Sequence, residues 1–97
     1  MHDVIVLYNR PADPEAFDAH YRNTHIPLVD ELPNLREFAW GKVVDGDVYL
    51  VARMTYDNAA EAAASMESAA GVAAVDDLGN FAHAGVTVLN VDRGDGR

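Results

Sequence analysis

The side chains best suited to proton transfer lie between residues 8 and 35. An imidazole titrates near neutral pH, so His25 can take up or release a proton on a bound substrate. Tyr21 precedes it by four residues, which places both side chains on one face of a helix. A phenol there can donate a hydrogen bond to a substrate carbonyl or to a developing oxyanion. We therefore predict His25 and Tyr21 as the catalytic residues.

Each of these residues also has a purely structural interpretation. His25 comes just before Pro27, which lacks an amide hydrogen and disturbs helical hydrogen bonding, so the imidazole could simply bond the opened backbone. Tyr21 could be a core aromatic residue at helical spacing. Both interpretations stay open at the level of sequence.

Five further residues are candidates for binding a substrate: Tyr8, Trp40, Tyr49, Arg53 and His83. Tyr8 ends an apolar run and could point into the same cavity, and Trp40 could form a wall for a planar ligand. Arg53 shares strand parity with Tyr49, and a buried arginine would need an anion such as a carboxylate. His83 is a second acid/base candidate. The structural alternatives are edge packing for Tyr8, a dimer contact for Trp40 and a salt-bridged surface position for Arg53.

The residue pattern gives no support for metal or nucleophile chemistry. His20 and His25 are five residues apart, whereas two zinc ligands on one helical face are four apart, and we expect His20 to be a solvated rim residue. We expect Asp76 and Asp77 to be a solvated pair. The chain has no glycine-rich phosphate loop and no serine nucleophile elbow. We therefore expect no metal and no cofactor.

A strand and a helix near the N-terminus have to position these side chains. Residues 3–8 form an apolar run that predicts a strand covered on both faces. Asp13 can cap a following helix, and Pro14 suits its first turn. The apolar stripe of this helix consists of Phe17, Tyr21, His25, Leu28 and Leu32. We expect a kink over residues 24–27 and the end of the helix at Pro33.

Three more strands are predicted from apolar runs. Residues 35–44 and 47–56 should pair through a two-residue turn at Asp45-Gly46, where both positions tolerate positive φ. Residues 86–92 should form the last strand. Residues 93–97 are expected to be a flexible polar tail.

An alanine-rich helix is predicted between the third and fourth strands. It should run from Ala59 to about Ala70 behind a cap at Asp57 or Asn58. We expect an interruption at Gly71, a shorter helical turn over residues 72–78 and a loop at residues 79–80.

The predicted order, β-α-β-β-α-β, is typical of one α+β, ferredoxin-like domain over residues 1–92. Two helices would cover one face of a four-stranded antiparallel sheet. The other face is also apolar, so something must cover it. A second copy of the sheet is the simplest cover, and we expect a homodimer through this open sheet face.

Composition limits the partners of the chain. Its 97 residues carry 16 acidic against 7 basic side chains, a net charge of -9, and such a surface repels nucleic-acid phosphates and anionic lipid headgroups. The sequence has no apolar run of membrane-helix length, no signal peptide and no cysteine. We therefore expect a cytoplasmic protein with no nucleic-acid or membrane partner.

Several motifs together resemble the EthD-like members of the dimeric α+β barrel family. They are Tyr8-Asn9-Arg10-Pro11, Thr24-His25-Ile26-Pro27-Leu28, Leu32-Pro33 with Leu35, and Asn80-Phe81-Ala82 with Gly85-Val86-Thr87. The resemblance extends over essentially the whole chain. It implies a dimeric barrel whose pocket lies between the helices and the sheet of each subunit. The wider superfamily includes polyketide cyclases, muconolactone isomerases and cofactor-free monooxygenases.

Two functional hypotheses follow. The first is a small cofactor-independent enzyme that acts by proton transfer, as a cyclase, isomerase, lyase or monooxygenase, on an apolar oxygenated metabolite. The second is a non-catalytic module that binds a small hydrophobic organic ligand or supports a neighbouring enzyme. Haem binding through a pocket histidine is a third possibility that the acidic surface disfavours.

Overall fold

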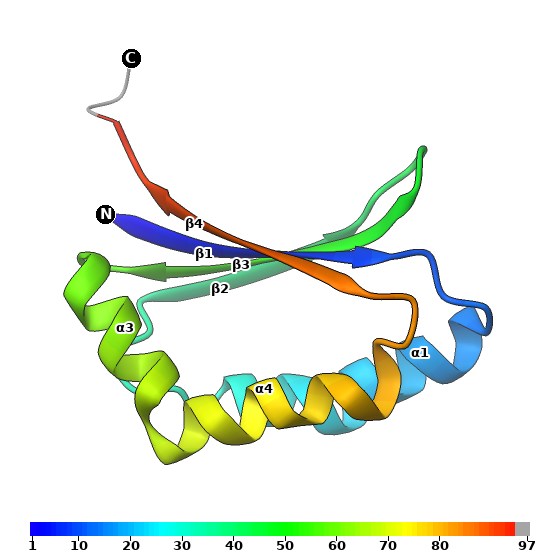
Figure 1. The fold of residues 1–97 in the computed structure, drawn as a ribbon, viewed down its shortest axis with the longest axis horizontal. Helices are drawn as coiled ribbons and strands as arrows, with labels where there is room; N and C mark the ends of the chain where they lie inside the picture. The colour runs from blue at the N-terminus through cyan, green and yellow to red at the C-terminus, as the bar shows by residue number, and fades with distance from the viewer. Residues whose placement is uncertain (95–97) are drawn as a thin grey trace.

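A four-stranded antiparallel sheet forms one layer of the molecule (Figure 1). The computed structural model describes residues 1–94. Its strands are β1 (His2–Asn9), β2 (Glu37–Lys42), β3 (Val48–Tyr56) and β4 (Val86–Asp92), in the spatial order β2-β3-β1-β4. Each neighbouring pair in that order is antiparallel. The predicted α+β class and ferredoxin-like strand arrangement are confirmed.

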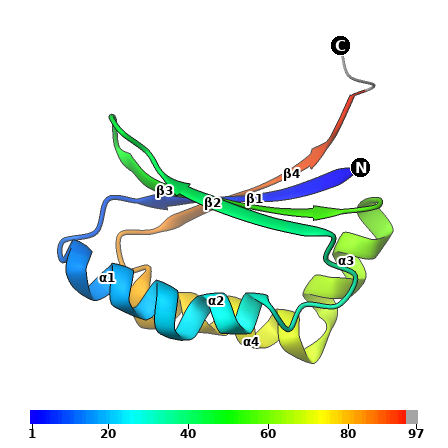
Figure 2. The ribbon, with the colours of Figure 1, turned by 180° about the vertical axis from the view of Figure 1, so that it is seen from behind.

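The helices form a second layer on one face of this sheet, as Figures 1 and 2 show from opposite sides. The first helical segment consists of α1 (Pro14–His20), η1 (Tyr21–His25) and α2 (Ile26–Val29), and the second of α3 (Ala59–Glu67) and α4 (Ala69–Phe81). Asp13 caps α1 by accepting a hydrogen bond from the Ala16 amide at 3.2 Å, as the sequence predicted. In the part of the chain described, no helix is both long and apolar enough to cross a membrane.

η1 is a π-helical turn, in which the Ile26 amide donates to the carbonyl of Tyr21, five residues earlier. The irregularity expected before Pro27 therefore takes the form of a widened turn. Because this turn adds a residue to the usual spacing, His20 and His25 lie on the same side of the helix and reach the same carboxylate. The expectation that their five-residue spacing separates them is wrong.

The second helical segment breaks at Ser68, not at Gly71 as predicted. Ser68 has an extended backbone with ψ 164°, and its hydroxyl accepts a hydrogen bond from the Gly71 amide at 3.1 Å, which caps α4. Gly71 lies inside α4, and glycine is required at this position because a Cβ would collide with the backbone carbonyls of Ser65 and Met66. The glycine thus allows the first turn of α4 to pack directly against the backbone of the last turn of α3.

α4 continues through residues 79–80 to Phe81, so the loop predicted there is wrong. Ala74, Asp77 and Phe81 are buried and recur along one face of the helix. Gly79 is part of α4, and a glycine inside a helix costs about 1 kcal/mol relative to alanine. Burying the Phe81 ring, which is 7 % exposed, offsets that cost, since a buried aromatic side chain contributes roughly 1.5–3 kcal/mol.

The core lies between the two layers and is rich in aromatic rings. Alternate residues of β1 and β3 face the helices, among them Tyr8 and Leu50, which are 2 % and 0 % exposed. Phe17 from α1 and Phe81 from α4 pack with their ring centres 5.1 Å apart, and both rings contact Tyr8. These contacts hold α4 beside α1 against the end of β1 that carries Tyr8.

The opposite face of the sheet carries no helix among the described residues (Figure 2). By strand parity this face presents Ile5 from β1, Val51 from β3 and Leu89 from β4. Leu89 is 42 % exposed. The apolar open face predicted from the sequence is therefore present.

A polar cluster of Asp3, Thr55 and Arg93 lies at one edge of this open face. Asp3 is buried and accepts hydrogen bonds from Thr55 at 2.7 Å and from the Arg93 guanidinium at 2.8 and 2.9 Å. The hydrogen bonds from Arg93 lower the pKa of the Asp3 carboxyl to about 2. Arg93 belongs to the segment 93–97 predicted as a flexible tail, of which residues 95–97 lie outside the described residues.

The β2–β3 connection is longer than the predicted two-residue turn, since β2 ends at Lys42 and β3 begins at Val48. Gly46 adopts a positive φ of 80°, whereas Asp45 does not. The register of β3 against β1 then shifts where Tyr8 pairs with Leu50 and Asn9 with Val48. This bulge leaves Tyr49 as an extra residue and changes the direction in which its side chain points.

Candidate functional site

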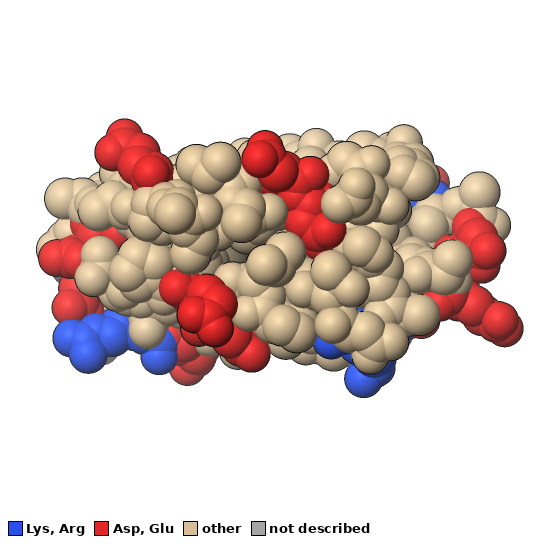
Figure 3. All heavy atoms as spheres, turned by 90° about the horizontal axis from the view of Figure 1, so that it is seen from below, with Lys and Arg blue, Asp and Glu red and all other residues tan. Residues whose placement is uncertain are grey.

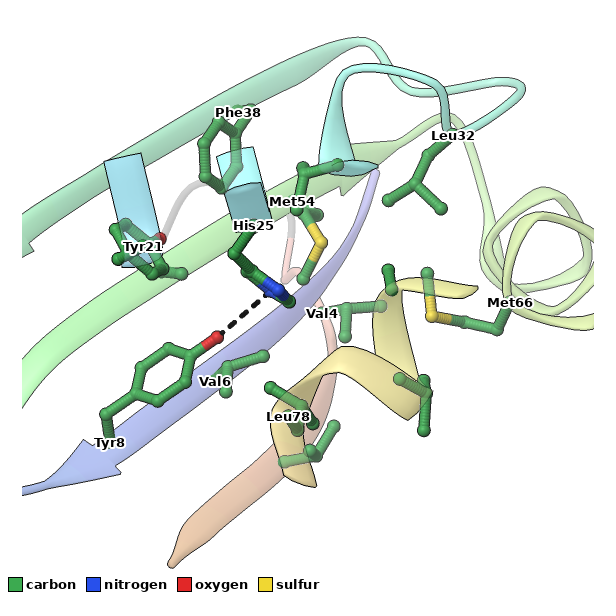
Figure 4. A pocket seen from close by; sticks show the side chains of 15 residues that line it. Val4, Val6, Tyr8, Tyr21, His25, Leu32, Phe38, Met54, Met66 and Leu78 are labelled. Carbon is green, nitrogen blue, oxygen red and sulfur yellow. Dashed lines mark hydrogen bonds between the residues drawn. The ribbon is translucent and has the colours of Figure 1, made fainter. Parts of the chain in front are cut away.

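His25 is the last residue of η1 and points into the space between the helices and the sheet (Figure 4). It is only 5 % exposed. Its Nδ1 lies 2.9 Å from Oδ2 of Asp77, and its Nε2 lies 3.4 Å from the hydroxyl of Tyr8. The imidazole is thus held between a carboxylate from α4 and a phenol from β1.

Asp77 is the residue that the sequence interpretation missed. The prediction that Asp76 and Asp77 are both solvated is wrong for Asp77, whose side chain is only 5 % exposed. Besides His25, it accepts hydrogen bonds from His20 Nε2 at 2.9 Å and from Asn80 Nδ2 at 3.0 Å. Had α4 been predicted as continuous, the spacing of Ala74, Asp77 and Phe81 would have placed Asp77 on its buried face.

His20 was predicted as a solvated rim residue. Its side chain is 25 % exposed, so it does lie at the rim, but its ring is fixed. Nε2 contacts both carboxylate oxygens of Asp77, at 2.9 and 3.0 Å, and the ring stacks on Phe81 with a centroid distance of 4.8 Å. Asp77 therefore links a buried imidazole to a partly exposed one.

Burial and hydrogen bonding set the protonation states at this centre. Burial lowers the pKa of His25 and outweighs the opposing effect of the Asp77 carboxylate. Burial works against the charged form of Asp77, yet hydrogen bonds from Asn80, His25 and His20 together lower its pKa. At neutral pH Asp77 is therefore ionised and His25 is neutral. His25 donates through Nδ1–H to Asp77, which leaves the lone pair of Nε2 on the side of Tyr8.

Two phenols adjoin His25. Burial raises the pKa of Tyr8 and that of Tyr21, so both remain protonated donors. The Tyr8 hydroxyl donates to Nε2 of His25. Tyr21 is 1 % exposed, and among the described residues its buried hydroxyl has no hydrogen-bond partner. A buried donor left without an acceptor costs about 1–3 kcal/mol, which a ligand oxygen would recover.

A cavity of about 80 Å³ adjoins these three side chains. Its remaining walls are almost entirely apolar and include Val4, Val6, Leu32, Met54, Met66 and Leu78. Figure 4 shows Tyr8 and His25 near one end and Met66 and Leu32 near the other. Polar groups are therefore confined to one end of a hydrophobic space.

The predicted residues Trp40 and Tyr49 are on the helical side of the sheet but do not line this cavity. The Trp40 ring packs edge-on against Tyr21 with centroids 5.2 Å apart and lies beneath the Arg22 guanidinium. Tyr49 donates to Asp18 at 2.9 Å. Trp40 supports the position of Tyr21, and Tyr49 fastens α1 to the sheet.

Arg53 and His83 are also placed away from the cavity. Arg53 lies on the open sheet face, where it pairs with Glu37 and donates to Thr55 at 2.8 Å. His83 follows α4, is exposed, and its Nε2 lies 3.1 Å from the carbonyl of Gly79. Sequence parity could not place Arg53, because parity assigns neighbours to opposite faces without saying which face is which.

A metal centre finds no support in the described part of the chain, where no group of three or more histidine, cysteine, aspartate or glutamate side chains is arranged to hold an ion. His20 and His25 do converge, but on a carboxylate that already accepts hydrogen bonds from both. The arrangement suits acid/base chemistry at His25.

A model of the EthD domain family matches residues 9–85, most of the chain, including His25 and Asp77. The chain belongs to the EthD family. It is 42 % identical over 97 residues to an uncharacterised 11.0 kDa protein of Rhodococcus erythropolis, covering 95 % of this chain and 94 % of the relative. An EthD-family protein of Bacillus halodurans superposes with a TM-score of 0.92 at 32 % identity, covering 97 % of this chain and 99 % of that one.

More distant structures share the fold of this EthD-family chain. One is a dimeric ferredoxin-like protein of unknown function from Jannaschia, with a TM-score of 0.72 at 18 % identity. The superposition covers 96 % of this chain and 100 % of that protein. At this level of identity the similarity establishes the architecture alone.

Proposed function

We propose that this EthD-family protein is a cofactor-independent enzyme that moves a proton on a neutral, apolar, oxygenated metabolite. The observation that carries the proposal is the hydrogen-bonded chain Tyr8–His25–Asp77 at the polar end of an otherwise apolar cavity. Cyclisation, isomerisation and elimination are the reactions that such a centre serves. A monooxygenase that activates a bound substrate by deprotonation would use the same residues.

In the proposed mechanism His25 is the base. When the Tyr8 hydroxyl turns from Nε2 to the substrate oxygen, the Nε2 lone pair is released and accepts a proton from a carbon next to the substrate carbonyl. The imidazolium that forms is stabilised by Asp77, whose oxygen lies 2.9 Å from Nδ1. The carbonyl oxygen, which becomes negative, accepts hydrogen bonds from the Tyr21 and Tyr8 hydroxyls. Return of the proton to another atom of the intermediate completes an isomerisation or permits ring closure.

The charge distribution supports a neutral substrate. Acidic residues outnumber basic ones by 16 to 7 in the sequence, and Figure 3 shows acidic side chains in several places on the helical face. Within residues 1–94, no lysine or arginine lines the cavity. An anionic substrate would be repelled from the surface and would find no cation in the site.

Isotope exchange at carbon tests the proposal directly. Neutral ketones and lactones are incubated with the protein in D2O, and loss of their α-proton signals is followed by NMR. In the matched variant His25→Asn, the amide nitrogen can still donate to Asp77 but no base remains. We expect this variant to exchange substrate protons about 100-fold more slowly or worse, whereas the variant His83→Gln should keep the wild-type rate.

The alternative, a binding module without catalysis, predicts a different result. Ketones would then shift the NMR signals of the cavity residues, yet no compound would exchange faster than in buffer. Equal exchange rates in wild-type protein and His25→Asn would also exclude His25 as the base.

We further propose that the chain forms a homodimer through its open sheet face. Exposed apolar side chains such as Leu89 on that face support this proposal, as does the dimeric description of the Jannaschia neighbour. Sedimentation of wild-type protein should give a dimer, and Leu89→Asp should weaken it. A monomeric wild-type protein at micromolar concentration would contradict the proposal.

A further inference from the structure

The size of the cavity limits which part of a substrate it can hold. Its volume is about 80 Å³, whereas an apolar protein cavity that binds benzene measures about 150 Å³. A planar six-membered ring is therefore too large for the enclosed end. A group of the size of an acetyl unit fits beside His25, and the rest of a larger substrate has to extend elsewhere.

The cavity opens between α4 and β4. Val75 of α4 and Val88 of β4 both line it, yet they are 54 % and 50 % exposed. The other end is closed by buried residues such as Leu32, which is 6 % exposed. Valine side chains from α4 and β4 thus surround the mouth of the cavity. Such a mouth favours an aliphatic over a charged group in the part of the substrate that passes through it.

The chemistry of the enclosed end favours a carbonyl group. Tyr21 supplies a buried hydroxyl that has no acceptor within the described residues. Tyr8 supplies a second donor, now held by His25 at 3.4 Å. The walls that lead away from these groups include the unbranched, flexible side chains of Met54 and Met66, which adapt to the shape of an alkyl chain.

We infer that the substrates are elongated aliphatic carbonyl compounds that bind end-on, with a small carbonyl-bearing end group at Tyr21 and His25 and an alkyl body leaving past Val75 and Val88. The inference rests on the proposed function and names its substrate class. It excludes substrates whose reacting carbonyl is attached directly to an aromatic ring.

A series of methyl ketones tests the inference. Binding of 2-butanone, 2-hexanone, 2-octanone and 2-decanone is measured by NMR titration of the 15N-labelled protein. Each methylene that enters the cavity or its mouth should tighten binding about fourfold. Acetophenone has as many carbons as 2-octanone but a ring beside its carbonyl, and it should bind about tenfold more weakly or worse because the enclosed end would be overpacked.

Two matched variants locate the alkyl body. Val75→Asp places a carboxylate at the mouth, whereas Ala73→Asp adds the same charge at an exposed position of α4 that does not line the cavity. Val75→Asp should weaken the binding of 2-octanone about tenfold, because a carboxylate covered by an alkyl chain loses hydration. The binding of 2-butanone, which is too short to reach the mouth, should stay unchanged. Ala73→Asp should affect neither ketone.

The outcomes separate the inference from the proposed function. Affinity that does not increase with chain length, or acetophenone binding as tightly as 2-octanone, would overturn end-on binding while leaving proton transfer at His25 intact. If no ketone of any length shifted the signals of Tyr21 and His25, both the inference and the proposed function would fail.

Discussion

Replacing Asp77 by asparagine should release the His25 ring from its fixed orientation and lower the free energy of unfolding. The carboxylate is 5 % exposed and accepts hydrogen bonds from His25, His20 and Asn80 at 2.9, 2.9 and 3.0 Å. An asparagine keeps one acceptor oxygen and turns an amide group toward at least one of these donors. Loss of one hydrogen bond to a charged group costs about 1.5–3 kcal/mol.

The destabilisation should be visible in thermal unfolding. A loss of about 2 kcal/mol in a domain of this size lowers Tm by roughly 8–16 °C. The matched control is Asp76→Asn, the same change at the neighbouring exposed position. It should shift Tm by no more than about 4 °C, because surface substitutions stay within about 0.5 kcal/mol.

The NMR signals of the histidine rings provide the second measurement. In wild-type protein the Nδ1–H proton of His25 should be visible at low field, because it is buried and bonded to a carboxylate. It should disappear or move upfield in Asp77→Asn, and the pKa of His25 should fall further because the neighbouring anion is gone. If Asp77→Asn matched Asp76→Asn in Tm and left the His25 signals unchanged, the assignment of Asp77 as the partner that orients His25 would be refuted.

Three further predictions concern the fold and the cavity. In urea unfolding, Gly71→Ala should destabilise the protein because its Cβ meets backbone carbonyls, whereas Gly79→Ala, with open space around it, should stabilise it by up to about 1 kcal/mol; equal effects would contradict the close α3–α4 contact. Stability should fall as pH drops below about 6.5, because the unfolded chain protonates its histidine before the buried His25 does. It should fall again from pH 3.8 toward 2 as Asp3 is protonated; a flat unfolding free energy between pH 7 and 5 would contradict the neutral state of His25. Tyr21→Phe should leave stability unchanged or raise it, since the removed hydroxyl has no hydrogen-bond partner in the described part of the chain, but it should weaken ketone binding about tenfold in the NMR titration.

The fold was largely predictable because its signals are local and periodic. The apolar run before Tyr8, the cap at Asp13 and the last strand all lie where the sequence placed them. The break in the second helical segment was predicted at the wrong residue. Glycine commonly ends helices, so the sequence pointed to Gly71, but the backbone is extended at Ser68. Only the collision that a side chain at Gly71 would cause explains why glycine stands there.

The candidate site was predictable only in part. His25, Tyr21 and Tyr8 were chosen from residue type and spacing, and the structure brings all three to one cavity. Arg53, His83, Trp40 and Tyr49 are elsewhere. Residue types suited to chemistry are common on any surface, and the face of a strand that becomes buried depends on what packs against it.

By itself, the sequence determined the element order, the buried helix face shared by Phe17, Tyr21 and His25, and the acidic, cysteine-free character of the chain. Further along the helix the prediction was wrong, because Val29 and not Leu28 is the buried residue. Tertiary structure alone decided that Asp77 orients this histidine, because the two residues are 52 positions apart and meet only when α4 docks beside η1. It also decided that His20 shares the same carboxylate. The physical reason is the π-helical turn, which spans five residues and so brings together two side chains that an α-helix would separate.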